Sequence, residues 1–222
     1  MSNKDQTQKI IEILKEEFPI VETPLIHKNA FQLLAATMLS AQTLDTTTNK
    51  VTPNLFQTYP TIKDLAKANP EDIEKIIKIV NYYKTKSKNL VKMANILIEK
   101  FNGEVPKSIE NLLEISGVGR KIANVVISEW FAKRPEFNML PEGFVVDTHV
   151  KRVSYRLGLT KHTDPKKIEQ DLMRVLPKKE WTDTSLRLIF HGRKVCKSQR
   201  PLCEICPLKR ICPRVGVKIT NY

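Results

Sequence analysis

Several features that assign a chain to a whole class of proteins are missing from this sequence. The first residues, Met1 to Gln6, are polar and contain no apolar segment of the kind that a secretory signal requires. The least polar segment, Ala30 to Ala41, is too short to span a bilayer as a helix. We find no internal repeat, heptad run or low-complexity tract. These absences predict a globular cytoplasmic protein with no membrane segment.

The alternation of apolar and polar residues that marks half-buried strands is nearly absent as well. The single candidate for a short strand is Phe144-Val145-Val146. Apolar residues recur instead at helical spacing, which predicts helices over residues 10–18, 31–40, 70–79, 90–101, 122–131, 150–157 and 168–176. Breaks are predicted around residues 21–24 and over residues 132–143, the latter as an exposed loop. The predicted fold class is therefore all-α.

Cysteine is scarce, and its placement excludes a disulfide framework. All four cysteines lie within residues 196–212, whereas disulfides that staple a fold are spread across it. Their spacing is Cys196-x6-Cys203-x2-Cys206-x5-Cys212. Four thiolates suit either a tetrahedral zinc ion or a cubane iron–sulfur cluster. Zinc ribbons usually have two close cysteine pairs, and only one close pair is present here, so the spacing favours a cluster.

Acidic residues are outnumbered by basic ones. The chain has 37 Lys and Arg against 24 Asp and Glu, which gives a formal net charge of +13 and a sequence pI of about 9.6. This surplus favours a polyanionic partner, with nucleic acid as the first candidate. Charge also keeps proteins soluble, so the surplus alone leaves both interpretations open. In the cysteine loop, Lys197 and Arg200 are two cations that can contact a phosphate.

A turn with two glycines joins two short predicted helices between Leu112 and Lys121. Gly117 and Gly119 let the backbone approach a phosphate closely, and the helix that follows presents its positive N-terminus to the same group. A plain tight turn between helices uses glycine in the same way. The flanking apolar residues and the Arg120-Lys121 pair favour phosphate binding.

Lys121 is the candidate nucleophile. It lies in the first turn of the second predicted helix, where the helix dipole and Arg120 disfavour the charged ammonium, and partial burial would add to this effect. A lysine amine has to lose its proton before it can attack carbon. The alternative is that Lys121 is one more cation in contact with a phosphate, and its position alone does not exclude this.

Asp147 follows the apolar pair Val145-Val146 and precedes a predicted helix. Aspartate is a preferred N-cap, so capping this helix is its expected structural role. The same carboxylate can assist the deprotonation of a lysine and stabilise a cationic sugar. We expect the nearby His149 to pack or to hydrogen-bond rather than to act as a catalyst.

Taken together, these segments resemble the endonuclease III family of helix–hairpin–helix DNA glycosylases. The hairpin and the cysteine spacing are highly specific in combination, and the resemblance extends over most of the chain. The matching segments are Leu39-Ser40-Ala41-Gln42, Asn102-Gly103-Glu104-Val105-Pro106, Gly117-Val118-Gly119-Arg120-Lys121, Ala123-Asn124-Val125-Val126, Val146-Asp147-Thr148-His149, His191-Gly192-Arg193 and the cysteine loop.

The resemblance implies a two-lobed fold. A six-helix barrel lobe with the helix–hairpin–helix would cover residues 22–133, and a second lobe would combine residues 1–21 with residues 134–222. The loop 196–212 of the second lobe would hold a [4Fe-4S] cluster on its four cysteines. Duplex DNA that contains damaged bases or abasic sites would lie in the groove between the lobes. The protein would act as a monomer, associated with the nucleoid.

The resemblance also implies a bifunctional glycosylase and AP lyase of base excision repair. A damaged base, expected to be an oxidised pyrimidine, is flipped out of the duplex. Lys121 forms a Schiff base with the sugar, Asp147 is its acidic partner, and β-elimination nicks the strand. Gln42 fills the space that the extruded nucleotide leaves. The residues expected to contact DNA are Gln42, Tyr82, Gly117, Gly119, Arg120, Lys197 and Arg200.

Three features depart from the family pattern. Tyr82 stands where the family usually has an aliphatic wedge, Ile122 stands where threonine is common, and the loop between residues 131 and 147 is longer than usual.

Two alternatives remain open. Tyr82-Tyr83 resembles the double tyrosine of mismatch adenine glycosylases, but Lys121 and the lack of glutamate over residues 28–48 oppose that assignment. The other alternative is a non-catalytic helix–hairpin–helix protein that only grips phosphates. The presence of both Lys121 and Asp147 opposes it.

Overall fold

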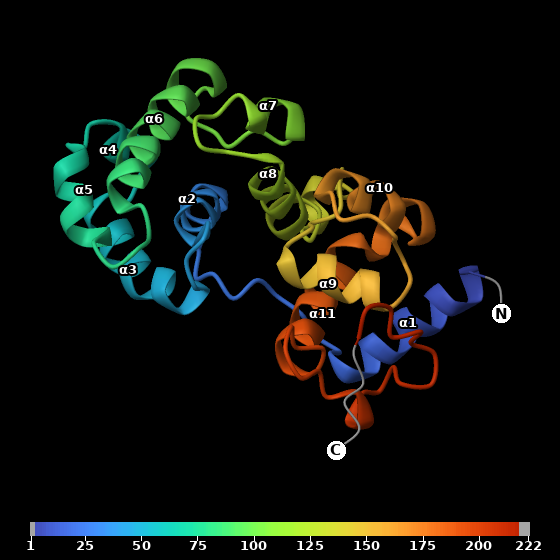
Figure 1. Cartoon of the computed structure of the whole chain (residues 1–222). Coiled ribbons are helices and arrows are strands. Elements are labelled where there is room, and N and C mark those ends of the chain that lie inside the picture. Colours follow the sequence, from blue (N-terminus) through green and yellow to red (C-terminus); the bar gives the residue numbers. More distant parts are fainter. Residues whose placement is uncertain (1–2, 218–222) are drawn as a thin grey trace. The chain divides into compact units, whose positions relative to one another are not determined.

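The computed structural model describes residues 3–217, and every regular element in that range is a helix (Figure 1). The chain forms two compact units. Pro24–Glu142 is continuous, whereas the other unit joins the chain up to Thr23 with the chain from Gly143 onward. Each unit has its own cluster of buried apolar side chains. The all-α prediction is confirmed. None of the helices in the described range combines the length and apolar character that crossing a bilayer requires.

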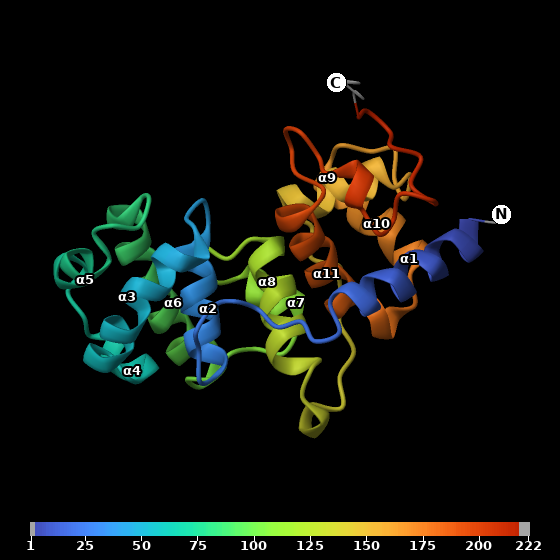
Figure 2. The same cartoon turned by 90° about the horizontal axis from the view of Figure 1, so that it is seen from below.

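The central helix of the unit Pro24–Glu142 is α2 (Ala30–Ser40). Figure 2 shows it among its neighbours, and it packs against α3 (Asp45–Thr58), α6 (Tyr83–Phe101) and α8 (Arg120–Val126). Nearly all α2 side chains are buried, so this helix is apolar all round, as a helix enclosed by others is expected to be. The shorter helices are α4 (Ile62–Ala66), α5 (Pro70–Ile77) and α7 (Ile109–Leu113).

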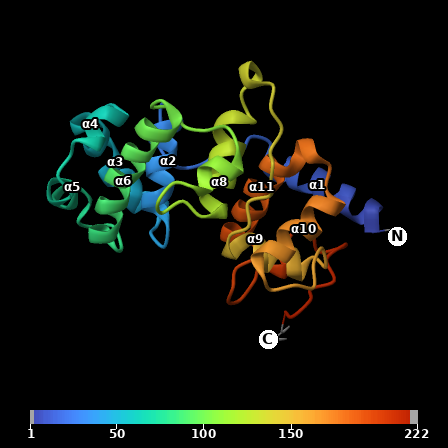
Figure 3. The same cartoon turned by 90° about the horizontal axis from the view of Figure 1, so that it is seen from above.

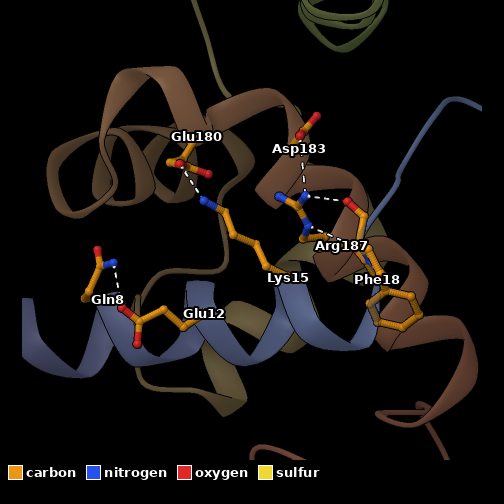
Figure 4. A network of polar contacts seen from close by, with 8 residues as sticks. Gln8, Glu12, Lys15, Phe18, Glu180, Asp183 and Arg187 are labelled. Carbon is orange, nitrogen blue, oxygen red and sulfur yellow. Dashed lines mark hydrogen bonds and ion pairs between the residues drawn. The ribbon is translucent and has the colours of Figure 1, made fainter.

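The other unit consists of α1 (Asn3–Glu17), α9 (Thr148–Arg156), α10 (Pro165–Val175) and α11 (Trp181–Lys194) (Figure 3). Helix α11 packs on α1 and α9. Figure 4 shows the polar contacts between the α1 and α11 segments. The buried Arg187 donates to the Phe18 carbonyl oxygen at 3.0 Å, and Lys15 pairs with Glu180 at 2.7 Å. These contacts fix the helix that leads into the cysteine loop.

Each helix predicted from apolar spacing is present, with altered ends. Helix α6 begins at Tyr83 and not at residue 90. The prediction missed its first turns because residues 83–89 are mostly lysine and other polar residues and show no apolar repeat. The predicted helix over residues 122–131 is α8 followed by η1 (Ile127–Phe131), five residues of π-helix. Asn29 and Asn69 accept backbone N–H groups at the starts of α2 and α5, which explains where these two helices begin.

Helices α3 and α11 are not predicted by the apolar spacing, because polar side chains occupy part of their buried faces. In α3, Thr48 and Thr52 are buried together with Val51 and Leu55. In α11, the buried polar side chains are Thr182, Thr184, Ser185, Arg187 and His191. A period computed from apolar residues alone therefore misses both helices.

Residues 144–146 do not form the short strand that their composition favoured. Phe144 is fully buried in the apolar cluster. Ser185 of α11 donates its hydroxyl to the Val145 carbonyl oxygen at 2.9 Å. A strand needs a neighbouring strand as its hydrogen-bonding partner, whereas the Val145 carbonyl is bonded by a side chain of a helix.

The segment 132–143, predicted as an exposed loop, is only partly exposed. It contains the short 3-10 helix η2 (Pro135–Phe137), whose last ring packs edge-on against Phe131 with ring centroids 5.0 Å apart. The guanidinium of Arg134 lies over the Trp130 ring, 3.4 Å from its centroid. Aromatic contacts therefore hold this long loop against η1.

Candidate active site and cysteine centre

The turn between α7 and α8 requires glycine at Gly117. Its φ is +82°, and a Cβ there would lie 2.9 Å from the Asn89 side chain and 3.2 Å from the Met38 side chain. Gly119, the N-cap of α8, has an extended backbone and open space where a Cβ would be. As a glycine, it has no side chain with which to cap α8.

Arg120 and Lys121 form the first turn of α8, and both are exposed. The partial burial that would have helped to deprotonate Lys121 is therefore not found. The reason is local, because α8 packs through Ala123, Asn124 and Val126 and turns its first residues outward. The Lys121 amine is thus accessible to a large substrate.

Gln42 and Tyr82 come from segments that are separate in the sequence, and the structure brings them together. The Asn81 side chain donates to the Gln42 carbonyl oxygen at 2.5 Å, and its backbone N–H donates to Thr43 Oγ1 at 3.2 Å. Gln42 and Tyr82 are both exposed and both adopt left-handed backbone conformations, with φ of 55° and 58°. Left-handed non-glycine residues are uncommon, so the segments around them must hold these conformations.

Asp147 caps α9, as predicted. Its Oδ1 accepts the backbone N–H groups of His149 and Val150, both at 2.8 Å. Its Oδ2 lies 2.9 Å from His149 Nδ1. The three contacts fix the orientation of a half-buried carboxylate, and they give His149 the hydrogen-bonding role that the sequence favoured. Asp147 and Lys121 belong to different units.

All four cysteines are free, partly buried and clustered around one cavity. The rest of this cavity is lined mainly by apolar side chains, together with Arg156, His191 and Arg214. In the described part of the chain, no group of three or more His, Cys, Asp or Glu side chains is arranged to hold a single metal ion. The four thiols are the donor set that could hold a cofactor, and Lys197 and Arg200 are exposed on the same loop.

Hydrogen-bond donors surround the thiols. Arg156 Nη1 donates to Cys196 Sγ and the backbone N–H of Arg214 donates to Cys212 Sγ, both at 3.4 Å. Burial raises the pKa of Cys206 to about 11 and also raises the pKa of Cys212. Without a bound cation these two thiols are therefore protonated near neutral pH. The shared cavity, the thiol set and the N–H donors fit a cationic cluster that would stabilise thiolates.

Two groups of residues near these sites were not predicted from the sequence. Arg152 and Arg156 of α9 bond backbone oxygens of the cysteine loop, including that of Cys196 at 3.0 Å from Arg152 Nε. Lys86 of α6 is buried beneath the Gln42 segment. The sequence does contain a sign of this burial. Lys86 precedes Leu90 by four residues, so it occupies a position in the apolar stripe of that helix.

The comparisons with known proteins agree in both sequence and structure. The profile described as "HhH-GPD superfamily base excision DNA repair protein" matches residues 35–178. Endonuclease III of Synechocystis sp. is 44% identical over 96% of this chain and 94% of its own length, and that of Bacillus subtilis is 41% identical over 98% and 96%. A solved structure of a trapped endonuclease III–DNA covalent intermediate is 40% identical with a TM-score of 0.87, covering 96% of this chain and 97% of its own. This chain therefore belongs to the endonuclease III family of base excision repair DNA glycosylases and AP lyases.

Proposed function

We propose that this protein removes oxidised pyrimidines from duplex DNA and then nicks the strand, with Lys121 as the nucleophile. The observation that carries the proposal is the exposed Lys121, which lies in the first turn of α8 directly after the glycine turn. A relative that is 40% identical is described as trapped in a covalent intermediate with DNA, which requires a nucleophile on the protein. DNA is therefore the proposed partner of this chain, and a monomer contains all of the residues that the reaction uses.

The turn at Gly117 and the exposed Arg120 bind the DNA backbone next to the lesion. The damaged nucleotide leaves the stack, and Gln42 and Tyr82 occupy the space that it vacates. The exposed tyrosine ring offers a face on which a neighbouring base can stack. These contacts hold the sugar of the extruded nucleotide at the α8 N-terminus, where Lys121 lies.

Lys121 then acts as its neutral amine. Its nitrogen bonds to the anomeric carbon while the bond from that carbon to the damaged base breaks, and the base leaves with a proton. The sugar ring opens to an imine on Lys121. Loss of a proton from the 2′ carbon expels the 3′ phosphate, which nicks the strand by β-elimination.

Asp147 supports this reaction as a fixed negative charge. Its carboxylate, oriented by the α9 amides and His149, stabilises positive charge on the sugar and the attacking amine and accepts a proton from Lys121. We propose that residues 22–133 form the barrel lobe, and that residues 1–21 and 134–222 form the second lobe.

The four cysteines would hold a [4Fe-4S] cluster, with its sulfur ligands stabilised by the N–H donors of Arg156 and Arg214. Such a cluster supplies a covalent cross-link across residues 196–212 and a site for one-electron chemistry. The loop so fixed presents Lys197 and Arg200 to DNA phosphates. An enzyme of this kind works on the genome, so we place it in the cytoplasm with the nucleoid.

The proposal is tested with duplexes that carry one lesion each. Wild-type protein should nick duplexes with an oxidised pyrimidine or an abasic site, and borohydride should trap it on both. The same assays distinguish the alternatives. A mismatch adenine glycosylase would release adenine from a mispair without a trapped adduct, and a binding protein would shift the DNA in a gel but leave both strands intact.

A further inference from the structure

We propose that Lys86 is a positioning residue, whose hydrogen bonds hold Gln42 and Tyr82 in the conformation that enters the DNA stack. The inference rests on the proposed function, because it assumes that these two exposed residues meet DNA.

Lys86 is an ammonium group buried under the Gln42 segment. It projects from α6 with a side chain that is only 8% exposed. Its Nζ donates to the carbonyl oxygens of Leu39 at 2.7 Å and Ala41 at 2.6 Å, and to Thr43 Oγ1 at 3.2 Å. The last carbonyls of a helix such as α2 lack hydrogen-bond donors within the helix, and they lie at the negative end of the helix dipole. An ammonium group supplies the missing donors and also the opposite charge. Lys86 thereby fixes the path of the chain on both sides of Gln42.

Thr43 extends this control to Tyr82. Its hydroxyl oxygen accepts from Lys86 Nζ and also from the backbone N–H of Asn81, at 3.2 Å in each case. The Asn81 side chain in turn donates to the Gln42 carbonyl oxygen. One hydroxyl therefore joins the segment after α2 to the segment before α6, and Lys86 lies under both.

The two segments present an unusual surface. Gln42 and Tyr82 are left-handed, and their side chains point away from the core that surrounds α2. Tyr82 is 64% exposed, and the same two segments expose Leu44 (73%) and Ile79 (56%). We call the surface formed by these two segments, residues 42–44 and 79–82, the tip. Exposed apolar side chains on a tip of fixed conformation are suited to enter a base stack, where flat apolar faces become available.

An apolar residue would fill the position of Lys86 at lower cost, as Leu90 and Leu97 do further along the same stripe. Burial of an ammonium without a carboxylate partner is unfavourable, and it lowers the pKa of Lys86 to about 8. The three oxygens that accept from Lys86 carry no formal charge. A lysine at this position is explained by the segment around Gln42 that it orders. Only a donor with several hydrogens can bond all three oxygens of that segment.

The test compares Lys86→Met with Lys88→Met at saturating protein. Lys88 is exposed and lies two residues further along α6, about 200° around the helix, so its loss removes the same charge without touching the Gln42 segment. The duplex carries a reduced abasic analogue opposite 2-aminopurine, whose fluorescence reports unstacking. A second duplex with a natural abasic site gives the single-turnover rate of borohydride-trappable imine formation.

Lys86→Met should lower both the fluorescence rise and the imine rate at least tenfold, while its affinity for undamaged duplex changes less than threefold. Lys88→Met should match wild type within twofold, and Lys86→Arg should recover part of the loss. In a Gln42→Ala background, Lys86→Met should add less than threefold, because both changes disable the same tip. Thr43→Val should repeat the defect in a milder form, and it keeps the test valid if Lys86→Met does not fold.

Imine formation and fluorescence equal to wild type in folded Lys86→Met or Thr43→Val would overturn the inference. The same conclusion would follow if the losses from Lys86→Met and Gln42→Ala multiplied independently. Failure of wild type to form any trappable imine would instead reject the proposed function.

Discussion

The exposed turns of Pro24–Glu142 and the cysteine loop of the other unit place their functional side chains in opposite ways. Gln42, Tyr82 and Lys121 project outward from turns and a helix end, and the groups that order them lie underneath. The cysteines instead face a common cavity, with Arg156 and backbone groups bonded around them. In the first region a substitution can abolish activity and leave the packing of the core intact. In the second region activity and stability depend on the same side chains.

The largest expected effect tests the first half of this comparison. Lys121→Gln removes the amine from an exposed position, so the rate of strand nicking should fall by at least about 10³-fold. The thermal midpoint should stay within about 1 °C of wild type, because exposed substitutions cost little stability. Single-turnover nicking of an abasic duplex and calorimetry measure the two quantities. Unfolding of Lys121→Gln would show that the turn region is not independent of the core.

Replacement of a cysteine, unlike Lys121→Gln, should lower the stability of the protein. Anaerobically purified wild type should contain about four irons per chain, and Cys206→Ala should lose them together with more than about 4 kcal/mol of stability. Iron analysis and denaturant unfolding check both results. Stoichiometric zinc in colourless, active wild type would contradict the cluster, and a stable, fully active Cys206→Ala would remove the difference between the regions.

Asp147 lies between the two extremes, because it both caps a helix and supports the reaction. Asp147→Asn retains an oxygen that can cap α9, so its stability should change by less than about 0.5 kcal/mol, while base release slows by roughly 10²- to 10³-fold. Asp147→Ala should show the same slow step and lose about 1 kcal/mol in addition. Normal base release by folded Asp147→Asn would leave the cap as its only role.

The remaining expected effect is on stability alone and concerns the pH dependence of the buried Lys86. Burial lowers its pKa to about 8 from an ordinary value of 10.5. Between these pH values the unfolded chain binds a proton that the folded chain has released, so the stability contributed by Lys86 rises with pH. Denaturant unfolding should show wild type gaining stability relative to Lys86→Met as pH rises from 8 toward 10.5. A constant or falling difference would mean that the lysine stays charged in the folded state.

The parts of the fold that sequence could predict are those that local residues determine. The apolar stripes of α1, α9 and α10 and the cap at Asp147 are readable because each depends on neighbours along one helix. Helices α3 and α11 are not, because threonine, arginine and histidine occupy buried positions that only tertiary packing explains.

The candidate site divides in the same way. Lys121, Asp147 and the cysteines can be selected singly from motifs. The link between Gln42 and Tyr82 depends on contacts between residues about forty positions apart, such as Asn81 to Gln42 and Lys86 to Thr43. No motif records these contacts. Burial of Lys86 is a property of the packed unit, and the lysine in the apolar stripe was its only trace in the sequence.

The identity of the reactive amine can be measured by mapping the reduced adduct. Wild-type protein is mixed with an abasic duplex and borohydride, the DNA is digested, and the modified peptide is identified by mass spectrometry. The chemistry proposed here predicts one modified residue, Lys121, in the peptide that begins α8. An adduct on any other lysine or on the N-terminal amine would contradict the assignment of Lys121 as the nucleophile.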